Sequence, residues 1–380
     1  MLKTNLLNNN YYVGFIYGIF LMFCQFQPNI GLPLILGGSI VYFSWRNIPK
    51  FYTQIFTIIL LKIIIISSIF LLFKFQYGLS YLAFRLSPDL IFITLLFFKP
   101  PIKFTGGFMN GIFVIFLLNL LFNIYSFFTG SDPFGREILI RTNENIPRFG
   151  GIFGHPYLSS YLNLITLLFA IFKRNKFMIF LSSVLCLFTG SLRSWAQFFS
   201  LIFTYISLKL KLKKSLIITI LITFSTLVII STFLYDTSAG NFTSGNAFRV
   251  FAWQNAIQRI SENPLIGYHG FSYFSFDGNI DPVSYDIVLN LGIAENQYLQ
   301  YMQDFGIIVG ILHLLLMYKI LNFYLEKYYK DPNNNFYFLQ AALVCLAFGD
   351  SFYGGILENI FMCAIFSVII FHKDSKEIAI

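Results

Sequence analysis

The sequence is poor in charged residues, in cysteine and in histidine. Only 11% of its 380 residues are charged, whereas a soluble globular chain carries about 25%. The four cysteines all lie within apolar segments, which argues against a disulfide framework in an exposed loop. The four histidines show no pair with ligand spacing, and the acidic residues form no metal motif. The sequence therefore predicts no metal site, and it implies no cofactor.

Apolar residues dominate what the sequence does contain. They make up 57% of the chain, and the mean hydropathy is +0.70. This composition predicts an all-α polytopic integral membrane protein, because each helical span needs roughly 20 apolar residues. We expect one membrane domain over residues 1–380 with about 12 transmembrane helices, the first of them retained rather than cleaved as a signal peptide. The expected spans are approximately 11–27, 30–45, 53–73, 80–98, 106–128, 152–172, 177–190, 194–208, 215–234, 296–323, 337–350 and 355–371.

The basic residues separate by type across this predicted membrane. One side holds 15 lysines and only two arginines, and the positive-inside rule identifies it as the cytoplasm, with both termini. Lys62 lies inside a span. The net charge of +9 comes from loop lysines, so we expect no nucleic-acid partner. The outer side or its edge holds Lys74 and seven arginines: Arg85, Arg136, Arg141, Arg148, Arg193, Arg249 and Arg259.

The choice of arginine on the outer side points to a ligand. The positive-inside rule explains where charge gathers, but it does not explain why the outer cations are arginines. A guanidinium group holds phosphate through two parallel hydrogen bonds and stays charged when it is buried. The outer face therefore predicts a site for a diphosphate or another acidic ligand.

Two outer loops are long enough to carry such a site, residues 129–151 and residues 235–295. The second is the longest loop, and within it residues 246–262 predict a helix whose apolar stripe includes Trp253. Ser244 or Asn246 could cap its start, and Asn263-Pro264 ends it. Tyr268 and His269 follow in a glycine-rich aromatic segment that could stack on sugar rings, although aromatic residues crowd membrane interfaces in any case.

A short span places another arginine near the membrane. Residues 177–190 give a helix of about 21 Å, which is less than the roughly 30 Å of the hydrocarbon core. The break that follows, Thr189-Gly190-Ser191-Leu192-Arg193-Ser194, is thus expected below the membrane surface. Arg193 would then be partly desolvated at the depth of a lipid headgroup, which makes it a candidate functional residue.

Three more candidates each have a structural alternative. Arg148 precedes a glycine-rich stretch, where it would hold a phosphate oxygen or serve as an interfacial anchor. Arg249 lies near the start of the loop helix, where it would bind an anion or stack on Trp253. Glu295 directly precedes the span at 296–323, where it would be a general base with a raised pKa or part of a helix cap. Gly306 in the same span reads most simply as part of a packing face.

Together these pieces resemble the O-antigen polymerase and ligase family of membrane glycosyltransferases. The likeness covers roughly residues 145–320, and four short motifs carry it in the expected order. They are Arg148-x-x-Gly151-x-Phe153-x-x-Pro156, then Thr189-Gly190-Ser191-Leu192-Arg193-Ser194, then Arg249-x-x-x-Trp253 running to Asn263-Pro264-Leu265-Ile266-Gly267, and finally Glu295-Asn296-x-Tyr298-Leu299 through Gly306.

The resemblance implies a function as well as a fold. It implies a large periplasmic loop over a cavity open to lipid in a bacterial inner membrane. It also implies metal-independent transfer of a glycan from undecaprenyl diphosphate to a hydroxyl group, with inversion at the anomeric carbon. A partner that regulates chain length is expected from the resemblance alone. Carried over by motif, Arg148, Arg193 and Arg249 would bind the diphosphate and stabilise the charge of the leaving group.

The fourth motif favours the polymerase branch of the family over the ligase branch. Ligases of the family look to have a histidine just before the asparagine, whereas Glu295 stands there in this chain. We therefore expect a polymerase of lipid-linked oligosaccharide repeat units, with Glu295 as the base or as a group that orients the acceptor. Glycan contacts are expected from Asn296, Tyr298, Trp253, Tyr268 and His269.

Two alternatives stay open. A ligase that transfers glycan to a lipid or protein acceptor would share the donor site and differ only at the acceptor. A flippase or transporter of lipid-linked oligosaccharide would also fit twelve spans with both termini inside. The sequence shows no repeat between its halves, which many transporter folds have, and this weighs against transport.

Overall fold

The computed structural model is mostly helical. It describes residues 2–26, 28–45, 50–72, 78–101, 103–135, 139–141, 146–154, 156–189, 192–236, 245–267, 296–352, 354–355, 357 and 359–372, and 84% of this part is helix. Its helices are α1 (Leu2–Phe26), α2 (Pro28–Tyr42), α3 (Lys50–Leu72), α4 (Gly78–Phe97), α5 (Phe104–Thr129), α6 (Pro156–Phe172), α7 (Lys176–Phe188), α8 (Leu192–Lys209), α9 (Lys214–Asp236), α10 (Gly245–Glu262), α12 (Gln297–Phe305), α13 (Ile307–Lys330), α14 (Asn335–Asp350) and α15 (Ile360–Ile370).

Short strands add to the helices. β1 (Ser44–Trp45) pairs antiparallel with β2 (Phe98–Lys99), and β3 (Leu139–Arg141) pairs antiparallel with β4 (Ile146–Arg148). A single 3₁₀ turn, η1 (Gly151–Phe153), follows β4. The hairpin of β3 and β4 and the turn η1 lie in the loop around residues 129–151, where the sequence predicted no regular structure. The all-α expectation therefore holds for the body of the fold and fails at these short strands.

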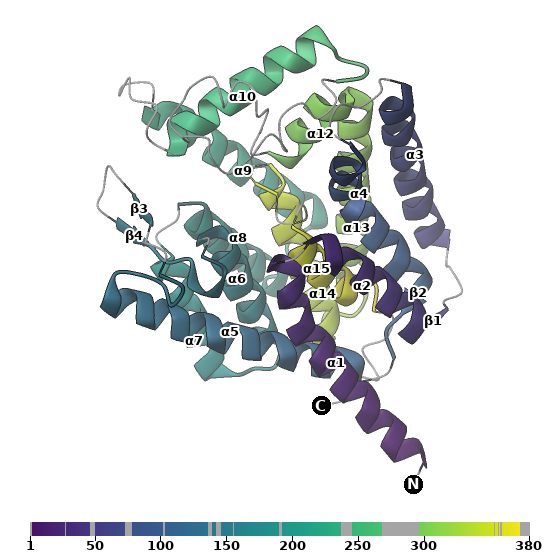
Figure 1. Ribbon diagram of the computed structural model, residues 1–380, viewed down its shortest axis with the longest axis vertical. Helices are drawn as coiled ribbons and strands as arrows, with labels where there is room; N and C mark the ends of the chain where they lie inside the picture. The colour runs from purple at the N-terminus through teal and green to yellow at the C-terminus, as the bar shows by residue number, and fades with distance from the viewer. Residues whose placement is uncertain are drawn as a thin grey trace.

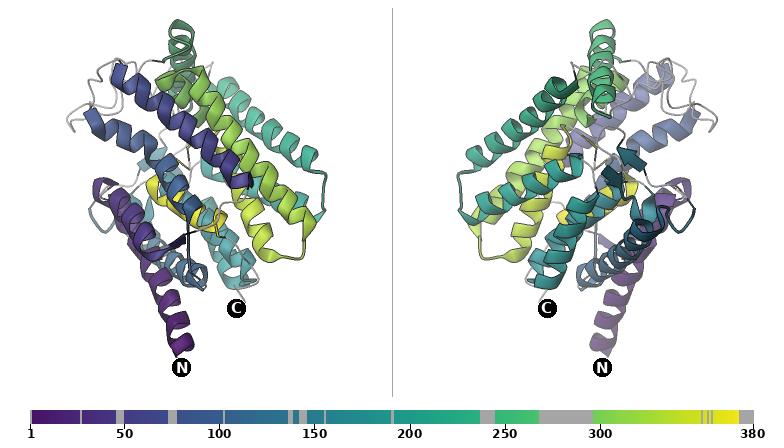
Figure 2. Two further views of the ribbon diagram at one scale, coloured as in Figure 1. Left: turned by 90° about the vertical axis from the view of Figure 1, so that its right-hand side faces the viewer. Right: turned by 90° about the vertical axis from the view of Figure 1, so that its left-hand side faces the viewer.

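The helices form an elongated body. Figures 1 and 2 show α10 across one end and the start of α1 at the opposite end. Helices α5, α6, α7 and α8 gather on one side, and α3, α4, α12 and α13 gather on the other (Figure 1). Between them lies α14, which packs against α6, α8, α9, α13 and α15.

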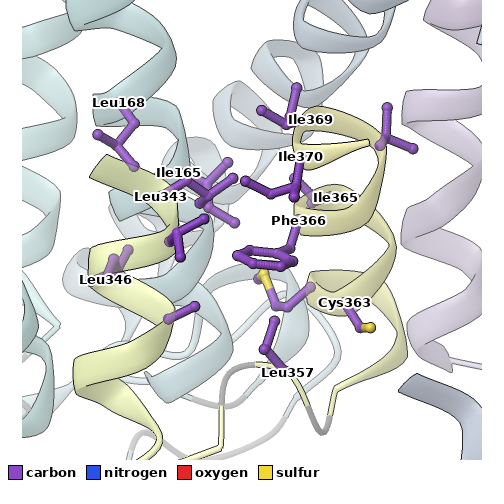
Figure 3. Packing of buried hydrophobic residues seen from close by; sticks show 14 of the residues in the cluster. Ile165, Leu168, Leu343, Leu346, Leu357, Cys363, Ile365, Phe366, Ile369 and Ile370 are labelled. Atoms are coloured by element: carbon purple, nitrogen blue, oxygen red, sulfur yellow. The ribbon is translucent and has the colours of Figure 1, made fainter. Parts of the chain in front are cut away.

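The core is built around α14 and α15. Nearly every residue of these two helices is buried, as expected for helices that are apolar on all sides. Figure 3 shows Leu343 and Leu346 of α14 near Leu168 of α6, with Phe366 of α15 on the other side. These side chains are at most 2% exposed. The centre of the body is thus a buried, largely apolar layer, as expected for a protein interior.

The membrane character of the chain is supported. Within the part of the chain that the structure describes, residues Phe51–Leu72, Phe104–Thr129 and Ile307–Lys330 are long and apolar enough to cross a membrane. Shorter apolar helices include Pro156–Phe172, Lys176–Phe188 and Lys214–Ile230. Twelve spans, and the cytoplasmic position of the termini, stay predictions.

The structure confirms two local predictions and corrects a third. The short span appears as α7, which has 13 residues, and the predicted loop helix appears as α10. The span predicted at 296–323 is not one helix. It is divided at Gly306, where φ is 86° and ψ is 165°, into α12 and α13. Only glycine adopts this backbone conformation readily. The chain therefore breaks its helix at a glycine that the hydropathy pattern placed inside a single span.

Candidate functional site

The short helix α12 is the element around which the candidate site is organised. Asn296 caps its start: its Oδ1 accepts a hydrogen bond from the backbone N–H of Leu299 at 3.0 Å. Its Nδ2 donates to the carbonyl oxygen of Phe352 at 2.6 Å. The cap interpretation of this motif is therefore confirmed for Asn296. Since both ends of its amide are occupied, its direct contact with a glycan stays a prediction.

A second set of bonds fastens the start of α12 to the turn after α14. The backbone N–H of Gln297 is shared between the carbonyl oxygens of Ser351 and Gly354, each at 3.0 Å. The hydroxyl of Ser351 donates to Oε1 of Gln297 at 2.9 Å. Gln297 and Ser351 are almost fully buried. These polar groups stabilise one orientation of α12, because a buried polar group that loses its partner is costly.

The residue before this turn, Asp350, connects two further helices. Its carboxylate is fully buried. Oδ2 accepts a hydrogen bond from the hydroxyl of Tyr161 on α6 at 3.0 Å, and Oδ1 accepts one from Nε2 of Gln197 on α8. Gln197 lies one helical turn after Arg193 along α8. Gln197 in the second turn of α8 and Gln297 at the start of α12 therefore both bond to the same corner, Asp350–Ser351.

The turn after α10 rests on the break between α12 and α13. The backbone N–H of Ile307 donates to the carbonyl oxygen of Pro264 at 2.8 Å. A Cβ on Gly306 would collide with the carbonyl of Leu265, and a Cβ on Gly267 would lie 2.6 Å from the carbonyl oxygen of Gln303. The third and fourth motifs of the sequence thus fit directly against each other. Their glycines allow the two backbones to touch.

Two buried ion pairs lie beside α12. Arg85 on α4 and Asp304 on α12 approach to 2.8 Å, with exposures of 3% and 1%. Lys62 on α3 and Asp89 on α4 approach to 2.9 Å, with exposures of 0% and 1%. Arg85, which the sequence placed among the outer arginines, is therefore engaged by a carboxylate within the protein.

Lys62 also contacts α12 and α13. Its Nζ lies 3.3 Å from Nδ1 of His313 and 3.7 Å from the ring centroid of Tyr301. The sequence placed Lys62 inside a span, but it did not reveal the partners of this lysine. The available signal was that a charge inside a span must be paired.

The four candidate residues for chemistry lie on or next to these elements. Arg193 is the second residue of α8, Arg249 is the fifth residue of α10, and Arg148 ends β4. The structure describes the backbone at these three arginines. Helix α10 packs against α12, while α6 and α8 pack against α14. Glu295, one residue before the cap of α12, lies outside the described residues, as do Tyr268 and His269.

Arg148 is joined to the body through η1. The backbone N–H of Ile152 donates to Oδ1 of Asn119 on α5 at 3.1 Å, and Nδ2 of Asn119 donates to the hydroxyl of Ser159 on α6 at 2.9 Å. Gly151 has a left-handed φ of 53°, and a Cβ there would collide with Asn119. The strand that carries Arg148 therefore leads into a turn that is fixed between α5 and α6.

The aromatic candidates are covered by protein. Trp253 is 2% exposed and Tyr298 is 5% exposed. The ring of Tyr298 lies 4.8 Å from that of Phe352 and 5.7 Å from that of His313, measured between centroids. Both residues contribute to packing, and their contact with a glycan stays a prediction.

One family model matches part of the chain. Residues 177–314 match the family model described as O-antigen ligase. The matched region runs from α7 to the first two turns of α13 and contains Arg193, Arg249 and Glu295. The match supports the O-antigen polymerase and ligase family, and with it a role in the assembly of O-antigen or another surface glycan on lipid-linked substrates. It does not separate polymerase from ligase. No curated protein matched the chain.

Proposed function

We propose that this protein polymerises undecaprenyl-diphosphate-linked oligosaccharide units into a surface polysaccharide, at the periplasmic face of a bacterial inner membrane. One observation supports the proposal most: Gln197, four residues after Arg193, and Gln297, two residues after Glu295, both bond to the Asp350–Ser351 corner. Arg193 and Glu295 come from separate motifs, and the chain between them is about a hundred residues long. Helix α10, which carries Arg249, packs against the same α12.

The proposed chemistry is a displacement at the anomeric carbon of the donor glycan. A hydroxyl group at the non-reducing end of the incoming unit attacks from the face opposite the diphosphate, and the bond from the anomeric carbon to the phosphate oxygen breaks. Glu295 accepts the hydroxyl proton. Arg148, Arg193 and Arg249 stabilise the charge that develops on the departing undecaprenyl diphosphate, an effect that is largest where water is excluded.

The second candidate function is ligation to a lipid or protein acceptor. The matched family model, described as O-antigen ligase, favours it. The same arginines would bind the donor, and only the acceptor would differ. We place polymerisation first because Glu295 stands where the ligase branch of the family looks to have a histidine.

The test uses the purified full chain and its lipid-linked repeat unit, with the products separated on a gel. The wild type should give a ladder, and Arg193→Lys and Glu295→Gln should abolish it. Arg141→Lys is the matched control, because it removes a guanidinium from the same outer loops without touching a motif, and it should keep the ladder. A wild type that builds no ladder but transfers one unit to an added lipid acceptor would replace polymerisation with ligation.

A further inference from the structure

A cavity separate from the candidate site lies among α6, α7 and α8. Its volume is about 460 Å³. Its walls are largely apolar and include Leu167 of α6, Ile179 of α7, and Phe198 and Leu201 of α8. Figure 1 shows these three helices as neighbours. An apolar cavity of this kind accommodates a hydrocarbon chain.

One end of the cavity is basic. Arg174 and Lys176 line it from the turn between α6 and α7, and both are exposed. Arg174 has a left-handed φ of 54°, a conformation that is uncommon for a residue other than glycine. Asn175 caps α7 by accepting from the backbone N–H of Met178 at 3.1 Å. The free backbone N–H groups of the first turn of α7 therefore lie beside the two cations, and a helix start of this kind attracts anions.

The helices around the cavity offer these cations no carboxylate. From residue 145 to residue 235 the sequence contains nine Lys and Arg residues and no Asp or Glu. The first turn of α7 has no acidic residue. The third cation of this turn, Lys173, is engaged elsewhere, because its Nζ donates to Oδ1 of Asn110 on α5. Any carboxylate or phosphate that binds Arg174 and Lys176 must therefore come from outside these helices.

We propose that this cavity binds an anionic phospholipid of the cytoplasmic leaflet. One acyl chain occupies the apolar cavity, and the phosphate lies between Arg174, Lys176 and the start of α7. The positive-inside rule assigns this turn to the cytoplasmic side, where anionic lipids meet basic pockets between transmembrane helices. The site is at the opposite membrane face from Arg193 and Glu295, so it is distinct from the proposed catalytic site.

The test measures lipid retention by the purified full chain in native mass spectrometry. The probes are phosphatidylglycerol and phosphatidylcholine with identical acyl chains. The wild type should retain phosphatidylglycerol preferentially, and the double variant Arg174→Gln/Lys176→Gln should lower that preference roughly 30-fold at low salt. Lys211→Gln/Lys213→Gln is the matched control. It also removes two charges from a turn between helices, and Lys211 has nearly the same left-handed φ as Arg174, 53°.

Three results would overturn the proposal. The first is equal retention of the two lipids by the wild type, and the second is an equal loss of preference in the two double variants. The third is tighter Arg174-dependent binding of undecaprenyl phosphate than of phosphatidylglycerol, which would make the cavity a site for the carrier lipid.

Ser183→Phe tests the cavity itself, because Ser183 lines it. This variant should lose phosphatidylglycerol with both cations in place, and unchanged retention would contradict the proposed path of the acyl chain.

Discussion

Replacing Asp304 with asparagine tests whether the buried ion pair between α4 and α12 holds the candidate site in place. The substitution keeps the shape of the side chain and removes its charge. Arg85 then remains buried at 3% exposure without its carboxylate. A guanidinium cannot escape by losing its proton, because arginine stays charged under all ordinary conditions. The variant therefore contains a buried cation that has lost this carboxylate.

The geometry sets the size of the effect. Two unit charges 2.8 Å apart attract by about 6 kcal/mol at an effective dielectric constant of about 20. Removing both charges from water costs several kcal/mol per ion, so the intact pair is close to neutral in net terms. Asp304→Asn removes the attraction and leaves the cost for Arg85. We expect a loss of about 3–5 kcal/mol. The double variant Arg85→Met/Asp304→Leu should instead lie within about 1–2 kcal/mol of the wild type.

The assay is the thermal unfolding midpoint of the purified protein in one detergent, with all variants measured side by side. Midpoints are compared as a ranking, because large membrane proteins often unfold irreversibly. The double variant should be more stable than Asp304→Asn alone. Lys62→Met is an internal comparison. This variant leaves Asp89 buried, and a carboxyl group can take up a proton. The unfolding midpoint of Lys62→Met should therefore fall less than that of Asp304→Asn. Equal midpoints for wild type and Asp304→Asn, or a double variant less stable than Asp304→Asn, would refute the argument.

Two further predictions concern the ends of α12. Gly306→Ala should cost about 1–3 kcal/mol for its backbone conformation alone, and more for the collision with the turn after α10. Gly106→Ala has open space around its Cβ and should leave the unfolding midpoint unchanged or higher, so equal losses would contradict the close fit. Asn296→Ala should cost about 1 kcal/mol and strongly reduce ladder formation. Asn334→Ala removes the cap of α14 with a similar loss of stability, and full activity in both cap variants would show that the start of α12 has no part in the reaction.

Local signals in the sequence predicted two elements closely. Helix α10 was expected at 246–262 and occurs at Gly245–Glu262, because Asn263-Pro264 is a strong stop signal. The short span before Arg193 was visible as an apolar run of about fourteen residues, and it forms α7. In both cases the information lies within a few neighbouring residues. Helix boundaries of this kind follow from local stop signals and apolar runs, which can be read from the sequence alone.

Tertiary contacts decided what the sequence could not predict. The apolar run at 296–323 gives no sign of a break, since glycine is common in membrane helices. The break at Gly306 is visible only once the turn after α10 is placed against it. Arg85 was grouped with the outer arginines because its position fits that side, and its partner Asp304 lies more than two hundred residues further along the chain. Hydropathy indicates how deep a residue lies in the membrane, but it does not indicate which charged residues form ion pairs.

The position of α12 between these contacts explains how such a small helix can serve a reaction. Its start is fixed by Asn296 and Gln297 to the turn after α14, and its end is fixed by Asp304 and Gly306 to α4 and to the turn after α10. A catalytic group must be held to within about half an ångström of its working position. Glu295 directly precedes the fixed start of α12, and the helix that carries Arg249 packs against the same element. Movement of α12 would therefore displace the proposed base and a proposed phosphate ligand together. It follows that variants at Asp304 should impair ladder formation even at temperatures where the protein remains folded.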